Sequence, residues 1–161
     1  MKIAVKTATV AVATTGIAVL GIACPATGFA DAGYPNIEKF GTPEELVEDG
    51  GAIVQTWTVS SLRPSADIIG WPVHGRLWEA DATVKATRGT VTPILADMNA
   101  RAADGQTYED LALAASPRAV RAAAMTQGGH STGKLYFDVI GAPPDSVVYN
   151  AGGRDLLLWV R

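Results

Sequence analysis

The residues from Arg76 to Thr87 alternate strictly between two kinds of side chain. One set of positions forms an apolar row that includes Trp78 and Val84, and the other set carries charged residues such as Glu79 and Lys85. Because successive side chains of a β-strand point to opposite faces, this period of two predicts a strand with one buried face. A helix would require a period near 3.6, so this feature favours folds built on a half-buried sheet.

The same period recurs along the chain, between breaks rich in glycine and proline. Further runs that we predict to be strands are 53–60, 98–102, 106–111, 135–139, 146–149 and 156–160. Asp104-Gly105 predicts a tight turn between the second and third of these runs. The last run is apolar on both faces, which indicates a strand covered on both sides. Short strands at this density predict one all-β domain, an antiparallel β-sandwich or barrel.

Two segments leave their secondary structure open. In 42–50, Thr42 could be the N-cap of a short helix with Pro43 as its first residue, and Gly50 would end it. An edge strand is the alternative for this segment. The alanine-rich segment 117–125 could form two helical turns in a crossover connection.

The first 32 residues have the pattern of a secretory signal peptide helix. Lys2 and Lys6 provide the positive start, and no residue from 8 to 23 is charged. Ala30-Asp31-Ala32 is an A-x-A pattern that predicts cleavage between Ala32 and Gly33. We therefore predict a leader over 1–32 and a β-sandwich domain over 33–161. An uncleaved membrane anchor is the alternative, although the apolar stretch is short for a bilayer span.

Cys24 is the only cysteine of the chain. It could carry a lipid as a lipoprotein acceptor, but Gly21 stands three residues before it, where such sites usually have leucine. If Cys24 leaves with the leader, the mature domain has no disulfide, although an extracellular compartment permits one. Secretion is the first prediction, and lipid anchoring through Cys24 is the alternative.

The charges of the chain are scattered and sum to a formal net charge of −3. No basic stripe is present to neutralise phosphates, so nucleic acid is not a predicted partner. For the same reason, we do not expect the mature form to bind an anionic membrane.

Gly129-His130-Ser131-Thr132-Gly133 matches the G-x-S-x-G pattern of a nucleophile elbow. Such an elbow needs a strand before the serine and a helix after it. Here a glycine pair precedes the motif and a strand follows it, so we expect a polar turn leading into that strand. His130 is adjacent to Ser131 and would point elsewhere, which leaves His74 as the one other candidate base. The sequence therefore does not favour a hydrolase.

The metal and acid–base patterns are equally weak. His74 and His130 are the only histidines, and neither has a second ligand at zinc spacing. The acidic run 44–49 lacks the spaced oxygen ligands of a calcium loop, so we expect a solvated acidic face. Glu79 and Asp81 share one strand face and are predicted to form an outer charged row opposite Lys or Arg. We predict no cofactor, no metal and no enzyme activity.

Recognition by loops is the remaining kind of site that the sequence favours. Trp71, beside Pro72 in a predicted loop, is the best candidate for an exposed recognition aromatic. His74 is expected on the surface close by. The candidate surfaces are 62–75 and 143–149, because recognition concentrates on loops held by a rigid scaffold.

Several segments in a fixed order also carry a resemblance to a known family. They are 57–62, 71–80, 88–93, 99–105, 131–139 and 155–159. From Tyr34 to Trp159 they resemble the small secreted immunogenic proteins of mycobacteria, also called immunoprotective extracellular proteins. The resemblance implies an immunoglobulin-like β-sandwich exported into the medium. It implies no established molecular function and no defined catalytic or ligand residues.

These observations lead to a first hypothesis of a secreted binding module whose partner is a host or cell-surface protein. The sequence predicts no oligomeric state. A carrier of a small apolar ligand is the second hypothesis, and it requires a cavity of about 300 Å³ or more between the sheets. An enzyme is the third, and it requires a histidine within hydrogen-bond reach of Ser131. The carrier would be excluded by a packed core of Trp57, Trp78, Val84, Phe137 and Leu157.

Overall fold

A computed structural model describes residues 35–114 and 116–161 of the chain. The predicted leader, with its cleavage site at Ala32 and Gly33 and with Cys24, lies outside these residues. The strands are β1 (Asn36–Lys39), β2 (Pro43–Glu48), β3 (Ile53–Pro64), β4 (Arg76–Arg88), β5 (Met98–Ala102), β6 (Thr107–Glu109), β7 (His130–Val139), β8 (Pro144–Ala151) and β9 (Arg154–Val160). Two short 3-10 helices are also present, η1 (Asp49–Gly51) and η2 (Leu95–Asp97).

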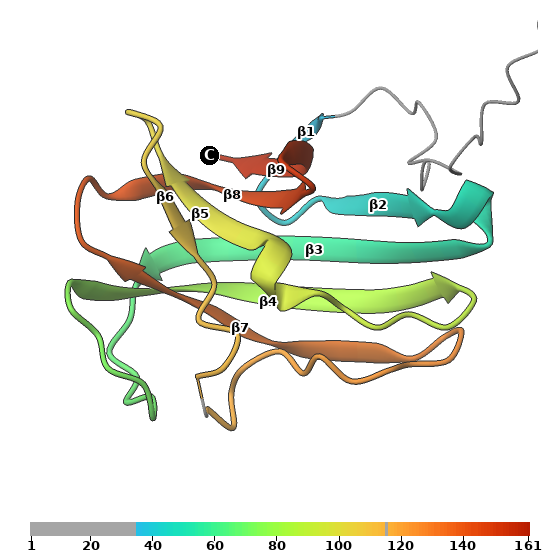
Figure 1. Ribbon diagram of the computed structural model, residues 1–161, viewed down its shortest axis with the longest axis horizontal. Coiled ribbons are helices and arrows are strands. Elements are labelled where there is room, and N and C mark those ends of the chain that lie inside the picture. Colours follow the sequence, from blue (N-terminus) through green and yellow to red (C-terminus); the bar gives the residue numbers. More distant parts are fainter. Residues whose placement is uncertain (1–34, 115) are drawn as a thin grey trace, which may run out of the picture.

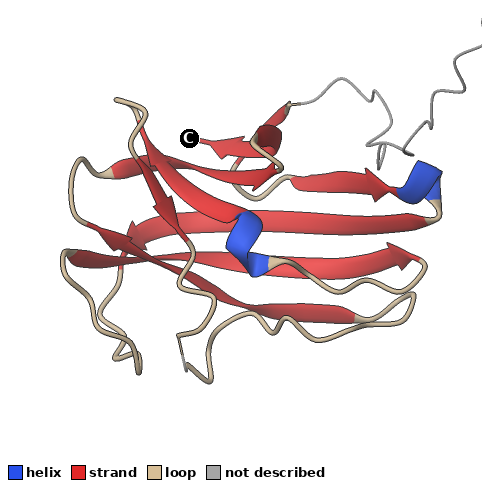
Figure 2. Cartoon of the chain, in the orientation of Figure 1, coloured by secondary structure: helices blue, strands red, loops and turns tan. Residues whose placement is uncertain are grey.

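The strands form two sheets that pack face to face (Figure 1). One sheet has the order β1-β9-β8-β5-β6, and the other has the order β2-β3-β4-β7. Strands and loops make up nearly all of the described chain (Figure 2). The predicted all-β sandwich is therefore confirmed. Among the described residues, no helix has the length and apolar character needed to cross a membrane.

The alternation from Arg76 to Thr87 is the basis of β4, which pairs with both β3 and β7. Ala80 and Val84 have no exposed surface, and Trp78 is 7% exposed. This apolar row faces the other sheet, as the period of two predicts. The long strand β3 supplies a matching row that includes the fully buried Trp57.

One continuous core fills the space between the sheets. It contains all five residues on which the carrier hypothesis depends: Trp57, Trp78, Val84, Phe137 and Leu157. None of them is more than 7% exposed. Because close-packed side chains occupy the interior, the structure argues against an apolar ligand held between the sheets.

Among the strands of the described residues, one pairing departs from the antiparallel pattern. β1 runs parallel to β9, with Asn36 opposite Leu157. After β1 the chain turns through Gly41, and β2 enters the other sheet. Because β1 and β2 lie in different sheets, the chain does not form a hairpin there. At this edge of the sandwich the chain therefore passes from one sheet directly into the other.

The helix that could have formed over 42–50 is absent, and the edge-strand alternative is correct. β2 pairs with β3, and Glu44 lies opposite Trp57. Leu46 faces inward and is fully buried. The local capping pattern of Thr42 and Pro43 is overridden because pairing with β3 satisfies the backbone of β2 and buries Leu46.

The alanine-rich segment 117–125 is also not helical. It runs along the free side of β7, where the Val120 amide donates to the Lys134 carbonyl at 3.1 Å and the Lys134 amide donates to the Arg118 carbonyl at 2.8 Å. Gly133 permits this approach, since a Cβ there would lie 2.6 Å from the Arg118 carbonyl oxygen. Pairing with β7 satisfies backbone groups that a helix would otherwise have satisfied internally.

Candidate functional site

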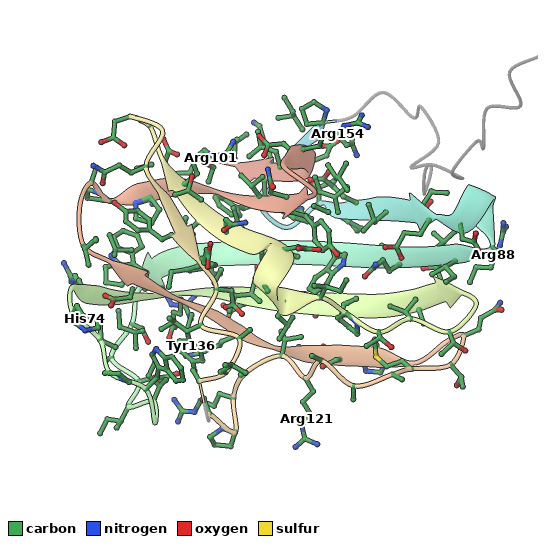
Figure 3. All side chains as sticks on the ribbon, viewed as in Figure 1. His74, Arg88, Arg101, Arg121, Tyr136 and Arg154 are labelled. Carbon is green, nitrogen blue, oxygen red and sulfur yellow. The ribbon has the colours of Figure 1, made fainter. Side chains whose placement is uncertain are left out.

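Large exposed apolar side chains gather on loops at one end of the sandwich. Ile68 is 98% exposed, Trp71 41% and Val73 36%, and all three lie in the loop 65–75 between β3 and β4. Leu113 and Ile140 are exposed on neighbouring segments. Figure 1 shows these loops at the left and lower left, and Figure 3 shows His74 and Tyr136 at the same end. We call the segment 65–75 the presentation loop.

Asp67 holds the first half of the presentation loop against β7. Its Oδ2 accepts hydrogen bonds from Lys134 Nζ and from the Tyr136 hydroxyl, both at 2.8 Å. Its Oδ1 pairs with the Arg118 guanidinium. The hydrogen bonds from Lys134 and then Tyr136 lower the pKa of Asp67, so the carboxylate stays ionised at neutral pH.

Glu79 lies beneath this contact and shares Lys134 with Asp67. Lys134 Nζ donates to Glu79 Oε2 at 2.8 Å, and Arg63 binds Glu79 Oε1 at 2.7 Å. Arg63 also pairs with Asp81 at 2.9 Å. The predicted cationic partners across the strands are therefore confirmed. The expected outer position is wrong for Glu79, which is only 4% exposed because the presentation loop covers it, with the Ser65 hydroxyl donating to its carboxylate.

Asp138 holds the other end of the presentation loop. Its Oδ1 accepts a hydrogen bond from the Gly75 amide at 2.8 Å, and its Oδ2 accepts one from the His74 amide at 2.8 Å. The His74 Nδ1 lies 3.3 Å from the same Oδ2. Burial would raise the pKa of Asp138, but the two amides and the imidazole together lower it. Ion pairs and charge-assisted hydrogen bonds thus fix both ends of the loop.

The residues proposed for recognition divide between surface and interior. Trp71 and His74 both lie exposed on the presentation loop, and the His74 side chain is 80% exposed. The other candidate surface, 143–149, is mostly interior, because β8 lies inside its sheet between β9 and β5. Only Pro143 and Asp145 are exposed there, so that expectation is wrong.

Ser131 does not lie on a nucleophile elbow. The expected polar turn is wrong for 130–133, which form the beginning of β7 and pair with β4. The Ser131 hydroxyl accepts a hydrogen bond from the Arg121 amide at 3.0 Å. His130 points to the opposite face of the strand, because successive side chains alternate. His74 contacts Asp138, which lies about 23 Å along β7 from Ser131 at ~3.3 Å per residue. The described residues therefore do not assemble a Ser–His pair at this motif.

Glu44 contradicts the expectation of a solvated acidic face over 44–49. It is 1% exposed, and neither carboxylate oxygen has a hydrogen-bond partner. Burial raises the pKa of Glu44 to about 8, and the charge of Glu38 adds to this effect. The Leu158 amide and the Asn36 side chain are near enough to lower that pKa somewhat, but they lie outside hydrogen-bond geometry. No group of three metal-ligating side chains occurs in the described ranges.

The fold and the loops together define a class: a β-sandwich domain that presents a clamped apolar loop at one end. The chain belongs to the family described as Domain of unknown function (DUF1942), which matches residues 35–159. It is 45% identical over 149 residues to the immunogenic protein MPT63 of Mycobacterium tuberculosis and to the immunogenic protein MPB63 of Mycobacterium bovis. Each alignment covers 90% of this chain and 94% of the relative.

A solved structure supports the same placement. The crystal structure of MPT63, described as a secreted protein from M. tuberculosis, superposes with a TM-score of 0.76 at 45% sequence identity. The match covers 81% of this chain and all of that one. The resemblance to the secreted immunogenic proteins of mycobacteria is therefore confirmed. The names of these relatives state an immune property and name no reaction or ligand.

Proposed function

We propose that this protein is exported and acts as a binding module that contacts a host or cell-surface protein through the presentation loop. The observation that carries the proposal is the exposure of Ile68, Trp71 and Val73 between two fixed points, Asp67 and Asp138. Tryptophan is among the residues enriched at the hot spots of protein interfaces, and exposed aliphatic side chains beside it add apolar surface that a partner can bury. A loop that is already ordered loses little conformational entropy on binding.

Export is supported by the leader pattern of 1–32 and by the secreted relative. We expect the protein recovered from the culture medium to begin at Gly33, since a cut after Ala32 follows the A-x-A pattern. N-terminal sequencing and intact mass measure this directly. A lipid on Cys24, or a chain that keeps its leader in the cell envelope, contradicts the prediction.

The presentation loop can be tested with the secreted protein immobilised on beads. Extracts of host and bacterial surfaces are passed over the parent, over Ile68→Ser/Trp71→Ser and over the control Ile94→Ser. Ile94 is also exposed, at 52%, but it lies before η2, outside the presentation loop. Loss of the Ile68 and Trp71 side chains should lower the affinity for a genuine partner about 30-fold or more, which corresponds to ~2 kcal/mol of binding free energy.

A partner that the parent and Ile94→Ser retain and the loop variant loses supports the proposal. The affinity of that partner is then measured by titration against all three proteins. The proposal is overturned if nothing is retained above background. It is equally overturned if every retained protein binds the loop variant as tightly as it binds the parent.

A further inference from the structure

A cleft of about 590 Å³ opens between β6 and the end of β7. Gln106, Tyr108 and Glu109 line one side, and Asp138 and Ile140 line the other. Its size lies within the range of about 300–1,000 Å³ that is typical of ligand sites. We call it the β6 cleft. The sequence motifs and the relatives assign nothing to it.

Hydrogen bonds pin the β6 cleft at both ends. At one end Asp110 and Phe137 form an isolated antiparallel β-bridge, and the Leu111 amide donates to the Tyr136 carbonyl at 2.7 Å. At the other end the Tyr108 hydroxyl donates to the Ala142 carbonyl at 2.8 Å, and Gln106 Oε1 lies 2.8 Å from the same hydroxyl. These contacts hold the two walls in place, so the cleft exists before any ligand arrives.

The backbone of β6 faces this gap. β6 is the last strand of its sheet and pairs with β5 alone. The Asp110 amide and the Gln106 carbonyl are directed to β5, at 2.9 Å each from their partners. Because hydrogen-bond direction alternates along an antiparallel strand, the amide and carbonyl of Thr107 between them are directed away from β5. Groups of this kind accept an added strand.

The charge of the β6 cleft favours a cation. Glu109 and Asp138 line it, and no Lys or Arg does. The Asp138 side chain is 15% exposed, and its carboxylate also accepts hydrogen bonds from the amides of His74 and Gly75. Hydrogen bonds to Asp138 keep the pKa of that carboxyl below its ordinary value. Ile140 is 75% exposed beside them and offers apolar surface to an aliphatic stem. A long basic side chain, with methylene groups and a charged end, matches both features.

We propose that the β6 cleft binds an extended peptide segment that adds to the Thr107 edge of β6 and places a Lys or Arg side chain between Glu109 and Asp138. The backbone of the peptide supplies the hydrogen bonds, and the basic side chain supplies the selectivity. This site shares Asp138 with the clamp of the presentation loop, but it uses neither Ile68 nor Trp71, so either proposal can fail without the other.

The test is an NMR titration of the 15N-labelled secreted protein with acetyl-Thr-Val-Arg-Val-Thr-amide. Matched probes carry citrulline in place of arginine, or N-methyl groups on the backbone. We expect amide shifts in 106–111, in 138–141 and at the two amides that donate to Asp138, those of His74 and Gly75. We also expect at least about tenfold tighter binding of the arginine peptide than of the citrulline peptide. N-methylation should abolish the shifts, because it removes the backbone donors that strand addition requires.

Protein variants separate this site from others. Glu109 is exposed, so Glu109→Gln should weaken binding of the arginine peptide about two- to fivefold. Glu45→Gln, which removes an exposed carboxylate from β2, should leave the affinity unchanged, and so should Ile68→Ser/Trp71→Ser. Equal affinity for the arginine and citrulline peptides, an unchanged affinity after N-methylation, or shifts confined to 65–75 would each overturn the inference. The last result would leave the presentation loop as the binding site.

Discussion

Lys134→Met is expected to lower the free energy of unfolding by about 3 kcal/mol, because it removes one partner of a buried ionic network. Lys134 Nζ binds both Asp67 and Glu79 at 2.8 Å, and its side chain is 18% exposed. The Glu79 side chain is 5% exposed, and among the described residues Arg63 is its remaining cationic partner after the change. Methionine fills a similar volume, so the loss reflects charge and hydrogen bonding more than packing.

Urea unfolding of the parent and Lys134→Met measures this difference. Lys85→Met is the control, since Lys85 is an exposed residue of β4 on the same sheet, and its loss should cost less than about 0.5 kcal/mol. Hydrogen exchange should also accelerate in the presentation loop, which loses its Asp67 contact to Lys134. The assignment of Lys134 as the central cation is wrong if the two variants are equally stable, or if exchange in 65–75 is unchanged.

Glu44→Leu is expected to have the opposite effect and to raise the free energy of unfolding by about 2 kcal/mol near pH 9. Glu44 is buried without a hydrogen-bond partner, so its charged form is destabilised in the folded protein. Leucine removes the polar group and keeps apolar atoms at an inward-facing position of β2. Replacing a buried, unpartnered carboxylate with an apolar side chain of similar size removes its desolvation cost.

The pH dependence of this gain has a defined sign. Because burial raises the pKa of Glu44 from 4.5 to about 8, the folded state holds a proton that the unfolded state has released between these values. The stability contributed by that proton is complete below about pH 4.5 and is lost as pH rises through about 8. The advantage of Glu44→Leu over the parent should therefore grow from about pH 5 to about pH 9.

Urea midpoints at about pH 5, 7 and 9 test the trend, since denaturant midpoints follow stability when the slope is unchanged. Glu44→Gln should show the same pH trend relative to the parent with a smaller gain, because its amide stays buried. Glu45→Leu changes the exposed neighbouring residue and should show no such trend. A gain that is constant over this pH range, or a loss of stability in Glu44→Leu, contradicts the account of Glu44.

Long alternating runs were predictable because their signal is local. The apolar row of β4, the Asp104-Gly105 turn and the inward phase of Trp57 each depend on neighbouring residues alone. Segments with conflicting local signals were not predictable. The helix-start pattern before Glu44 and the alanine-rich segment 117–125 both became extended, because pairing with β3 and β7 outweighed their local preference.

The position of the presentation loop was predictable from the sequence, but the contacts that hold it on the sandwich were not. Trp71 and His74 pointed to it, since a tryptophan in a Gly- and Pro-rich loop has no alternating neighbours with which to be buried. Asp67 carried no signal of its own. Its partners Lys134 and Tyr136 are 67 and 69 residues away in the sequence, and only the packing of the loop on β7 brings them together.

The sequence by itself determined the class of fold, the faces of the long strands and the family, because side-chain periodicity and segment order are properties of the linear chain. Only the tertiary structure decided that β1 runs parallel to β9, that Glu44 and Glu79 are buried, and that a cleft separates β6 from β7. These features depend on which distant segments meet. Contacts between distant segments decide which residues are buried, which charges pair and which strand edges stay exposed. The alternation of side chains along one strand does not determine them.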